Sequence, residues 1–365
     1  MNKLVKYFIL LLLISNCTSK NDDKNEKVSF PISVRLSDCF RQPTKMLLSL
    51  SDIADSISYI QLETSGESIV GNVTSIKQVS DGFLINDRTK SLLKFDKEGR
   101  FIWKLSKQGR GPLEYEILNP DFCIDERLKE IYLPDRKNIF IYDYNGQPKE
   151  VIKLPFYVDK IFFLKTGFYL VSNSNPNEQF LASVIDHRGL IIKQFQNNNI
   201  QQKVNYFGRL SNTSGSQIIS DKDKILLSNL DTIWELDEEL CLNIKYVIDR
   251  RIENSEDQVY SYSLNVLNDS LLIFSIIYKA DHYLFDIRSK LYYELKDGTI
   301  NDDMDSGPDV AIWKAKGGMI IEALPASEFL KVDITKVKEE SKLFKILTGI
   351  NINDNPVIRI IKLKE

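Results

Sequence analysis

The chain has 365 residues, of which 43% are hydrophobic and 27% charged, and its formal net charge is -3. This length allows one large domain or two ordinary ones, and the composition is that of a globular protein. A nucleic-acid-binding surface needs an excess of basic residues, so the acidic balance argues against a nucleic-acid partner. The 16 Tyr and 19 Phe, together with many aliphatic residues, favour β-structure.

The first residues have the pattern of an export signal. Lys3 and Lys6 precede the apolar run 7–14, which is too short to cross a bilayer, and Cys17 follows soon after. The segment resembles the lipobox of bacterial lipoproteins, whose cysteine is acylated. We therefore expect residues 1–16 to be a lipoprotein signal peptide and Cys17 to anchor the protein in the cell envelope, at the outer membrane, on its periplasmic or its surface face. The alternative is a plain secretory signal with an incidental cysteine.

Residues 17–50 are expected to form a polar tether and a lead-in to the folded domain. The stretch TSKNDDKNEK after Cys17 is charged and lacks large apolar residues, as flexible tethers do. Asp22 and Asp23 resemble the surface-export signal of Bacteroidota lipoproteins. The folded domain is then expected over residues 51–365.

A repeated unit of short strands begins near residue 83. In 83–105, strand-like runs flank a polar turn and an Asp-x-x-Gly turn, and 131–154 has the same form, with Asp135-Arg136 matching Asp87-Arg88. The turn aspartate recurs at intervals of 43 to 51 residues, as Asp96, Asp143, Asp186, Asp237 and Asp286. Short strands that repeat every 40–50 residues or so are typical of a β-propeller.

The Asp-x-x-Gly turns are interpreted as hairpin connections. The aspartate can accept hydrogen bonds from the N–H groups that follow it, and the glycine supplies the positive φ that reverses the chain. The residues with this expected structural role are Asp96, Gly99, Asp143, Gly146, Asp186 and Gly189. Calcium needs six to eight oxygen ligands and each turn offers one or two carboxylates, so no metal is expected there.

Six copies predict an all-β, six-bladed β-propeller with blades of four antiparallel strands. The fourth copy loses the turn glycine, and a degenerate sixth copy covers 319–334. The strand-like stretch 57–62 precedes the first full copy and needs a partner. We expect it to join the incomplete last blade, so that N- and C-terminal strands close the ring and leave no long edge exposed.

With these features the chain resembles the six-bladed β-propeller lipoproteins of Bacteroides and related Bacteroidota. The match rests on Cys17, the stretch 58–71, the blade 83–115 and the closing strand 353–364. The tail of that blade is close to the family's Gly-Arg-x-Gly-x-Gly-Pro-Gly-Glu-Tyr loop, with Ser-Lys and Leu113 as departures. The resemblance implies an envelope propeller with kinship to NHL-type propellers, which include binding modules and a few lyases, but no agreed activity.

The glycine-rich loop 106–115, SKQGRGPLEY, raises the question of a phosphate site. A P-loop needs Gly-x-x-x-x-Gly-Lys-Ser/Thr before a helix, which this loop lacks. Gly109, Gly111 and Pro112 are therefore interpreted as shaping the crossing between two blades. We expect Arg110 to pair with Glu114 and Tyr115 to pack on the adjoining blade, or both to contact ligand if the loop lines the channel mouth. The candidate ligand-binding residues are Arg88, Arg110, Tyr115 and Arg136.

Side chains suited to catalysis or metal binding are few. His187 and His282 are the only histidines, so a histidine-rich zinc site is excluded, and the sequence has no Gly-x-Ser-x-Gly elbow. We expect no metal, no cofactor and no catalytic residue. Cys39, Cys123 and Cys241 are far apart, so no disulfide framework is implied; Cys123 and Cys241 lie in apolar runs and are expected to be buried.

Two readings of the function remain. We favour a lipid-anchored, non-catalytic binding or scaffolding module that holds a glycan, a peptide or an envelope protein. The alternative is a propeller lyase or hydrolase acting on a polysaccharide or peptide, with carboxylates and arginines converging at the channel mouth. The acidic pairs Asp125-Glu126 and Asp302-Asp303 lie in polar loops and are expected to be solvated. A divalent ion at the ring centre, stabilising the fold without chemistry, is a third option.

Overall fold

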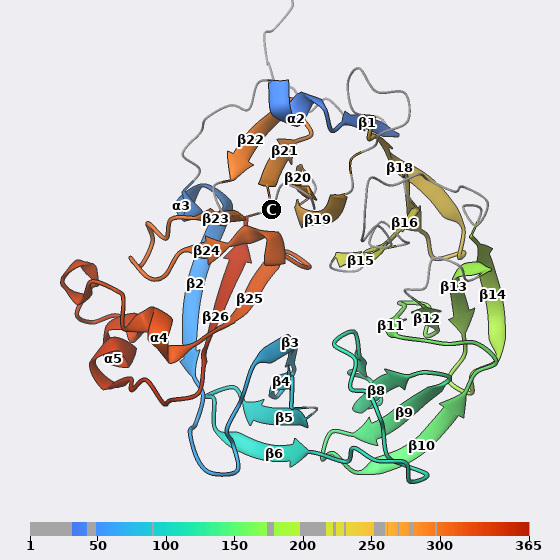
Figure 1. Ribbon diagram of the computed structural model, residues 1–365, viewed down its shortest axis with the longest axis horizontal. Coiled ribbons are helices and arrows are strands. Elements are labelled where there is room, and N and C mark those ends of the chain that lie inside the picture. The colour runs from blue at the N-terminus through green and yellow to red at the C-terminus, as the bar shows by residue number, and fades with distance from the viewer. Residues whose placement is uncertain are drawn as a thin grey trace, which may run out of the picture.

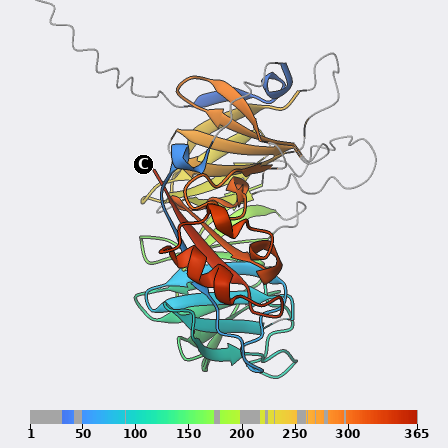
Figure 2. The same ribbon diagram turned by 90° about the vertical axis from the view of Figure 1, so that its left-hand side faces the viewer.

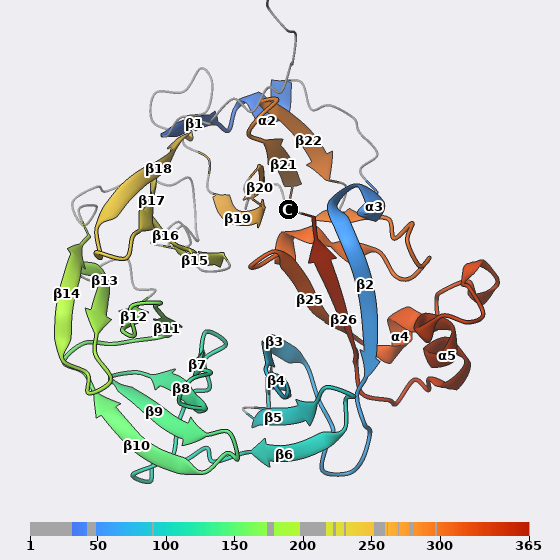
Figure 3. The same cartoon turned by 180° about the vertical axis from the view of Figure 1, so that it is seen from behind.

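The chain folds into a ring of six β-sheets, which Figures 1 and 3 show from its two faces. The computed structural model describes residues 31–41, 49–89, 91–173, 179–197, 217–221, 224–229, 231–251, 260, 262–268, 270–276, 281–295 and 298–364. The signal segment 1–16 and Cys17 lie outside these residues. Each sheet is a blade that runs from the centre of the ring to its rim, so the expected all-β, six-bladed propeller is confirmed.

Four blades are four-stranded antiparallel sheets, with the first strand innermost and the last at the rim (Figure 1). The first blade contains β3 (Val73–Val79), β4 (Gly82–Asp87), β5 (Ser91–Asp96) and β6 (Phe101–Leu105). The second contains β7 (Cys123–Asp125), β8 (Glu130–Asp135), β9 (Asn138–Asp143) and β10 (Pro148–Lys153). The third contains β11 (Lys160–Phe163), β12 (Tyr169–Ser172), β13 (Phe180–Ile185) and β14 (Ile191–Gln196). The fifth contains β19 (Tyr262–Asn268), β20 (Leu271–Ile276), β21 (Asp281–Asp286) and β22 (Leu291–Leu295).

The fourth blade gains a fifth strand from the N-terminal lead-in. Its own strands are β15 (Gln217–Asp221), β16 (Lys224–Asn229), β17 (Thr232–Leu236) and β18 (Leu242–Asp249). β1 (Ile32–Arg35) pairs in parallel with β18 at the rim, and the short helix α2 (Asp38–Arg41) follows it. Val34, Leu36 and Cys39 are buried there. The packed part of the chain therefore begins before residue 51, inside the segment expected to be the lead-in.

The sixth blade is closed by strands from both ends of the chain, as expected. β26 (Val357–Leu363) lies between β2 (Ala54–Gln61) and β25 (Met319–Leu324), and both pairings are antiparallel. The remaining elements of this region are α3 (Leu50–Ile53), β23 (Thr299–Ile300), β24 (Val310–Ala311), η3 (Ile312–Lys314), α4 (Ala326–Phe329), η4 (Ile334–Lys336) and α5 (Lys342–Gly349). Since this blade has three strands in its ladder, the sixth copy expected at 319–334 holds only β25, and helix replaces the rest.

Helices α4 and α5 lie outside the rim of the sixth blade (Figures 1 and 2). Ala326 and Phe329 of α4 and Leu343 and Ile346 of α5 are buried together with Tyr59 of β2. Their three-residue spacing places each pair on one helix face, which explains why this segment packs as helix on the sheet edge. Within the described residues, no helix is both long and apolar enough to cross a membrane.

The core lies between neighbouring blades. All six residues of β4 and all six of β8 are buried, because each middle strand is covered on both faces. Between the first and second blades, Leu84 and Leu92 pack with Ile131, Leu133 and Phe140, which are all less than 10% exposed. Blade stacking thus explains why these strands are apolar at nearly every position.

Candidate functional site

Connections between strands emerge on two opposite faces of the ring. Because the strands of a blade alternate in direction, the links 106–122 and 136–137 lie on one face and the hairpin turns 97–100 and 126–129 on the other. We call these the crossover face and the hairpin face. The four candidate ligand-binding residues all belong to connections of the crossover face or to its β4–β5 turn.

The backbone of the glycine-rich loop binds the carboxylate of Glu114, a residue of the same loop. The N–H of Gly111 donates to Glu114 Oε2 at 2.9 Å. A Cβ added to Gly109 would lie 1.9 Å from the same oxygen, so glycine leaves room for this carboxylate. An internal carboxylate therefore takes the place that a phosphate would need, and the loop is shaped for the crossing between blades.

Tyr115 is fully buried and cannot contact a ligand, so the ligand-binding expectation for this residue is wrong. Its hydroxyl donates to the carbonyl of Leu105 at 3.3 Å, and its ring packs in the core between the first and second blades. Packing on the adjoining blade, the other expectation for Tyr115, is what the structure shows. Burial raises the pKa of its phenol, which therefore stays protonated.

Glu116 brings two of the candidate arginines together. Its carboxylate lies 2.8 Å from Arg136 Nη2 and 3.6 Å from Arg110 Nε. Arg110 pairs with Glu116 rather than with Glu114, its expected partner. Since the Arg110 side chain is 89% exposed, its charge is available to solvent on the crossover face.

Beneath this pair lies Asp135, a buried carboxylate with one unused oxygen. Asp135 Oδ2 accepts the N–H groups of Glu116 at 2.6 Å and Ile117 at 3.2 Å. Asp135 Oδ1 is buried and has no hydrogen-bond partner. The next residue, Arg136, has φ +57, a conformation that costs energy for a residue with a side chain. An unpaired acceptor and a strained residue side by side are features that functional sites often show.

Apolar and aromatic side chains complete this surface. Leu113, Ile117 and Tyr157 are 37%, 45% and 50% exposed. The Tyr157 ring lies 5.4 Å from Lys137 Nζ, and the N–H of Val158 donates to the carbonyl of Arg136 at 2.6 Å. We call this patch the second-blade surface, and its members are Arg110, Leu113, Glu116, Ile117, Arg136, Lys137 and Tyr157. Sequence reasoning missed Tyr157, which belongs to the β10–β11 link and to no motif.

Arg88 occupies the corresponding position in the first blade. There both oxygens of Asp87 are used, because Gly71 N donates to Oδ2 at 3.1 Å and Thr89 N donates to Oδ1 at 2.7 Å. Arg88 is exposed, and the structure shows its backbone N–H donating to Asn72. The matching Asp-Arg pairs of the two blades therefore differ, and an unused acceptor is found only in the second of these two.

The turn aspartates lie on the hairpin face and hold their turns. Asp96 Oδ1 accepts the N–H groups of Glu98 at 3.0 Å and Arg100 at 2.8 Å, and Asp143 and Asp186 accept two N–H groups in the same way. Although burial opposes it, hydrogen bonds from Arg100 hold the pKa of Asp96 below its ordinary value. In the fourth blade Leu240 takes the glycine position with φ +60.

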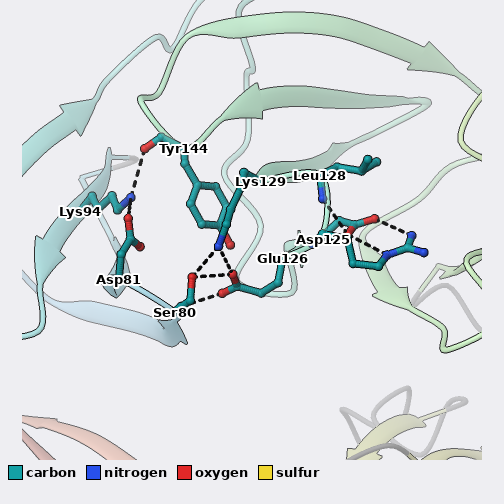
Figure 4. Close-up of polar contacts among 9 residues, drawn as sticks. Ser80, Asp81, Lys94, Asp125, Glu126, Leu128, Lys129 and Tyr144 are labelled. Carbon is teal, nitrogen blue, oxygen red and sulfur yellow. Dashed lines mark hydrogen bonds and ion pairs between the residues drawn. The ribbon is translucent and has the colours of Figure 1, made fainter.

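A polar network joins the first two blades on the hairpin face (Figure 4). Ser80 donates from N and Oγ to the Glu126 carboxylate, both at 2.8 Å, and Lys129 Nζ donates to Glu126 Oε2 at 2.8 Å. Lys94 Nζ donates to Asp81 at 2.7 Å and to the carbonyl of Tyr144 at 3.3 Å. These charges are matched by partners inside the network, so we assign it to holding the blades together.

Asp125 and Arg127 form a further pair of a carboxylate and an arginine, on the hairpin face. Asp125 is buried, pairs with Arg127 Nη2 at 3.0 Å and accepts from Tyr169 at 3.2 Å, so its expected solvation is wrong. Asp302 is also buried, and accepts from Tyr59. Burial raises the pKa of both Tyr169 and Tyr132, and the Tyr169 hydroxyl donates to that of Tyr132 at 2.7 Å.

The histidines and cysteines lie apart from these clusters. His187 is exposed in a turn, and His282 Nδ1 lies 2.7 Å from Ser275 Oγ within the fifth blade. Cys39 and Cys123 are buried, whereas Cys241 is exposed, contrary to its expected burial, because it ends a hairpin turn before β18. In the part of the chain that the structure describes, no three His, Cys, Asp or Glu side chains are grouped to hold a metal ion.

Comparison with known proteins agrees with this architecture. Residues 31–362 match a family described as a domain of unknown function, DUF4934. The chain belongs to the DUF4934 family. The part of this DUF4934 propeller that matches the family begins at residue 31, just before β1. No curated protein sequence matches the chain.

Solved structures similar to this DUF4934 propeller include a Bacteroides fragilis protein assigned as exported. It is 17% identical, with a TM-score of 0.62, and the alignment covers 92% of this chain and 99% of that one. A protein of unknown function from Bacteroides thetaiotaomicron has 9% identity and a TM-score of 0.42, over 84% of this chain and 76% of that one. BamB from Moraxella catarrhalis has 16% identity and a TM-score of 0.39, over 66% of both chains. The first likeness concerns the fold alone, and the other two are too weak to inform function.

Proposed function

We propose that this DUF4934 propeller is a lipid-anchored protein of the cell envelope that binds or scaffolds a glycan, a peptide or a protein partner without catalysing a reaction. The observation that carries the proposal is the second-blade surface. Exposed aromatic and apolar side chains lie there beside two arginines, and Tyr and Arg are the residue types that most often anchor interfaces.

The chemistry of this surface favours a ligand that carries hydrogen-bond donors. The Glu116 carboxylate, whose side chain is 32% exposed, can accept a hydroxyl of a sugar or an N–H of a peptide, whereas the unpaired Asp135 Oδ1 is buried and out of reach of a ligand. Arg110 and Arg136 share one carboxylate, so each keeps donors for a ligand oxygen. Tyr157 adds a flat apolar face on which a sugar ring or a side chain can stack.

The location is supported by the sequence and by the comparison. The lipobox-like segment before Cys17 favours a lipid anchor at the outer membrane, and a structurally similar Bacteroides fragilis protein is assigned as exported. Kinship with NHL-type propellers is part of the same proposal and rests on the sequence resemblance. A propeller on a polar tether would present both of its faces to partners.

Thermal shift of the purified full chain against panels of glycans and peptides tests the proposal. We expect a ligand that raises the Tm and whose affinity falls about tenfold or more in Arg136→Ala and Tyr157→Ala, as for interface anchors. Arg288→Ala, in an exposed hairpin-face turn of the fifth blade, is the matched control and should bind normally. Equal binding by all three variants would exclude the second-blade surface, and conversion of a bound ligand into product would overturn the non-catalytic role.

A further inference from the structure

Three lysines outside the second-blade surface come from inner strands of three different blades. Lys77 lies in β3 of the first blade, and Lys160 begins β11 of the third. Lys316 directly precedes the turn into β25 of the sixth blade. Since β3, β11 and β25 lie on the inner side of their blades, these side chains originate around the centre of the ring (Figures 1 and 3).

Two of these lysines reach from one blade to another. Lys77 Nζ lies 5.0 Å from the centre of the Phe122 ring, which leads into β7 of the second blade. Lys316 Nζ lies 5.6 Å from the centre of the Phe162 ring in β11, so it extends from the sixth blade to the third, across the ring. The N–H of Ile161 donates to the carbonyl of Asp121 at 3.2 Å and holds these two stretches side by side.

The backbone places Lys316 by means of a tight turn. Gly317 and Gly318 have φ +61 and +73, the conformation of a two-residue hairpin turn that favours glycine at both positions. Lys316 and Met319 exchange both backbone hydrogen bonds across this turn, at 2.8 and 3.2 Å. The Lys316 side chain is therefore held at the inner edge of the blade rather than on a loose loop.

The charges at this centre are unbalanced. None of Lys77, Lys160 and Lys316 forms an ion pair with a carboxylate of the described chain. Lys77 and Lys160 are half-buried, and Lys316 is exposed. Burial, and then the charge of Lys316, lower the pKa of Lys77 to about 8, and Asp121 opposes this. Burial also lowers the pKa of Lys316; the nearby Asp121 carboxylate opposes this shift, and the charge of Lys160 adds to it.

We propose that the centre of the ring binds an oxyanion, held by Lys77 and Lys316 with Lys160 nearby. The group would be a sulfate, a phosphate or a carboxylate, either as a free ion or as part of an anionic glycan. An oxyanion with several oxygen atoms can accept hydrogen bonds from ammonium groups of several blades at once. Its negative charge would also offset the repulsion between these ammonium groups. This inference deepens the proposed binding function, because it names the charge class of the ligand.

Calorimetric titration of the purified full chain with sodium sulfate, at constant ionic strength set with sodium chloride, tests the site. We expect saturable binding that weakens roughly 10–100-fold in Lys77→Met and in Lys316→Met, since each removes a charged donor. Lys97→Met, at an exposed turn of the first blade, is the matched control. Lys77→Arg should retain binding, which separates loss of charge from loss of packing. Circular dichroism checks that each variant is folded.

The pH dependence gives an independent readout. Between pH 7 and 9 Lys77 loses its proton, and the neighbouring Cys123 stays neutral because burial raises its pKa to about 12. The charged groups that face Lys77 are Lys316 and Asp121. Sulfate binding by the unaltered chain should therefore weaken over this range, and Lys77→Met should show a smaller change. Binding that is equal at both pH values and in Lys77→Met would overturn the oxyanion site.

A second arm identifies the source of the anion and separates this inference from the proposed function. A chondroitin sulfate tetrasaccharide that binds more tightly than sulfate, and loses affinity in Lys316→Met, indicates a glycan ligand; sulfate binding alone indicates a free ion. Glycan binding that depends on Arg136 but not on Lys77 or Lys316 would sustain the proposed function and refute the site at the centre. Sulfate binding at the centre, with no glycan or peptide ligand found, would sustain the oxyanion site and refute the proposed function.

Discussion

Gly99 shows how a single residue seats the first blade against the last. It has φ +86, and a Cβ at this position would lie 2.3 Å from the carbonyl oxygen of Gln61 in β2. Its own carbonyl accepts the N–H of Glu63 at 2.8 Å. The turn that joins β5 and β6 is therefore packed on the strand that closes the ring, so glycine is required both for conformation and for space.

We expect Gly99→Val to lower the free energy of unfolding by about 1–3 kcal/mol, because a β-branched residue is strained at positive φ. The backbone clash with Gln61 adds to this cost. Gly66→Val is the matched control, since a Cβ there meets nothing within 4 Å. Urea denaturation of both variants measures the difference. Equal stabilities would mean that the turn adopts another conformation.

Asp249 is the residue from which we expect a pH-dependent loss of stability. A side-chain hydrogen bond from Arg251, with its Nη2 2.6 Å from Asp249 Oδ2, is the main cause that lowers the pKa of Asp249 to about 2. An unfolded aspartate has a pKa of about 3.9, so the folded state holds the charged form more strongly. This contribution is complete at neutral pH and is lost as the pH falls from about 4 to about 2.

Comparison of the Tm of the unaltered chain and of Asp249→Asn between pH 2 and 5 measures this contribution. The variant should show a smaller decrease in Tm across that window, because it lacks the titrating group. Asp55→Asn, at an exposed position of β2, is the control and should follow the unaltered chain. Superimposable curves for all three proteins would show that the Asp249 pair does not stabilise the fold.

Among the elements, the pairing of β25 with β26 contains the most deeply buried charges of the ring closure. Glu322 and Arg359 are cross-strand partners, and Arg359 donates to Glu322 Oε2 from Nε at 3.0 Å and from Nη2 at 2.5 Å. Arg359 also donates to the carbonyls of Pro308 and Asp309, and both side chains of the pair are almost inaccessible. The Nε, Nη1 and Nη2 atoms of Arg359 therefore all donate hydrogen bonds inside the protein.

Removing the carboxylate should destabilise the closure strongly. We expect Glu322→Leu to lower the free energy of unfolding by about 3–5 kcal/mol, because Arg359 would remain buried without its counter-charge. The double variant Glu322→Leu with Arg359→Leu should recover part of this loss, since no charge is then left buried. Urea denaturation of both variants measures these free energies of unfolding. A loss below about 1 kcal/mol in the single variant would contradict a stabilising role of the buried Glu322–Arg359 pair.

The sequence predicted strands correctly where a local pattern alone defines the strand. The strands of the first two blades could be predicted because apolar runs bounded by Asp-x-x-Gly turns have few other conformations. β1 was not predicted. Its four residues follow a polar stretch and show no repeat pattern, and they pair with a strand more than 200 positions away in the sequence. The sixth copy was wrong beyond β25, because Ala326 and Phe329 have the three-residue spacing of a helix face and their segment forms α4.

For the whole molecule, the ring is closed by β2 and β26, while β1, the first described strand, belongs to another blade. β1 lies at the rim of the fourth blade (Figure 1). The residues before 31, with Cys17 among them, lie outside the described part of the chain.

If the proposed lipid anchor is on Cys17, we expect Cys17→Ser to release the protein from the membrane without changing its fold, because the thiol that would carry the lipid is lost. Fractionation of cells, with the Tm of the released protein as the check of folding, measures this. Cys241→Ser, which alters an exposed thiol inside the propeller, is the control and should stay in the membrane fraction. Recovery of Cys17→Ser in the membrane would contradict lipid anchoring.

The sequence by itself determined the class of fold, the number of blades and the manner of closure, because these follow from the spacing of local turns and from the alternation of strands. Only the tertiary structure decided which side chains meet. It buried Tyr115, joined Arg110 and Arg136 through Glu116, and left Asp135 Oδ1 without a partner. It also brought lysines from three blades toward one centre. Contacts between residues of different blades depend on how the sheets stack, and no local pattern records that geometry.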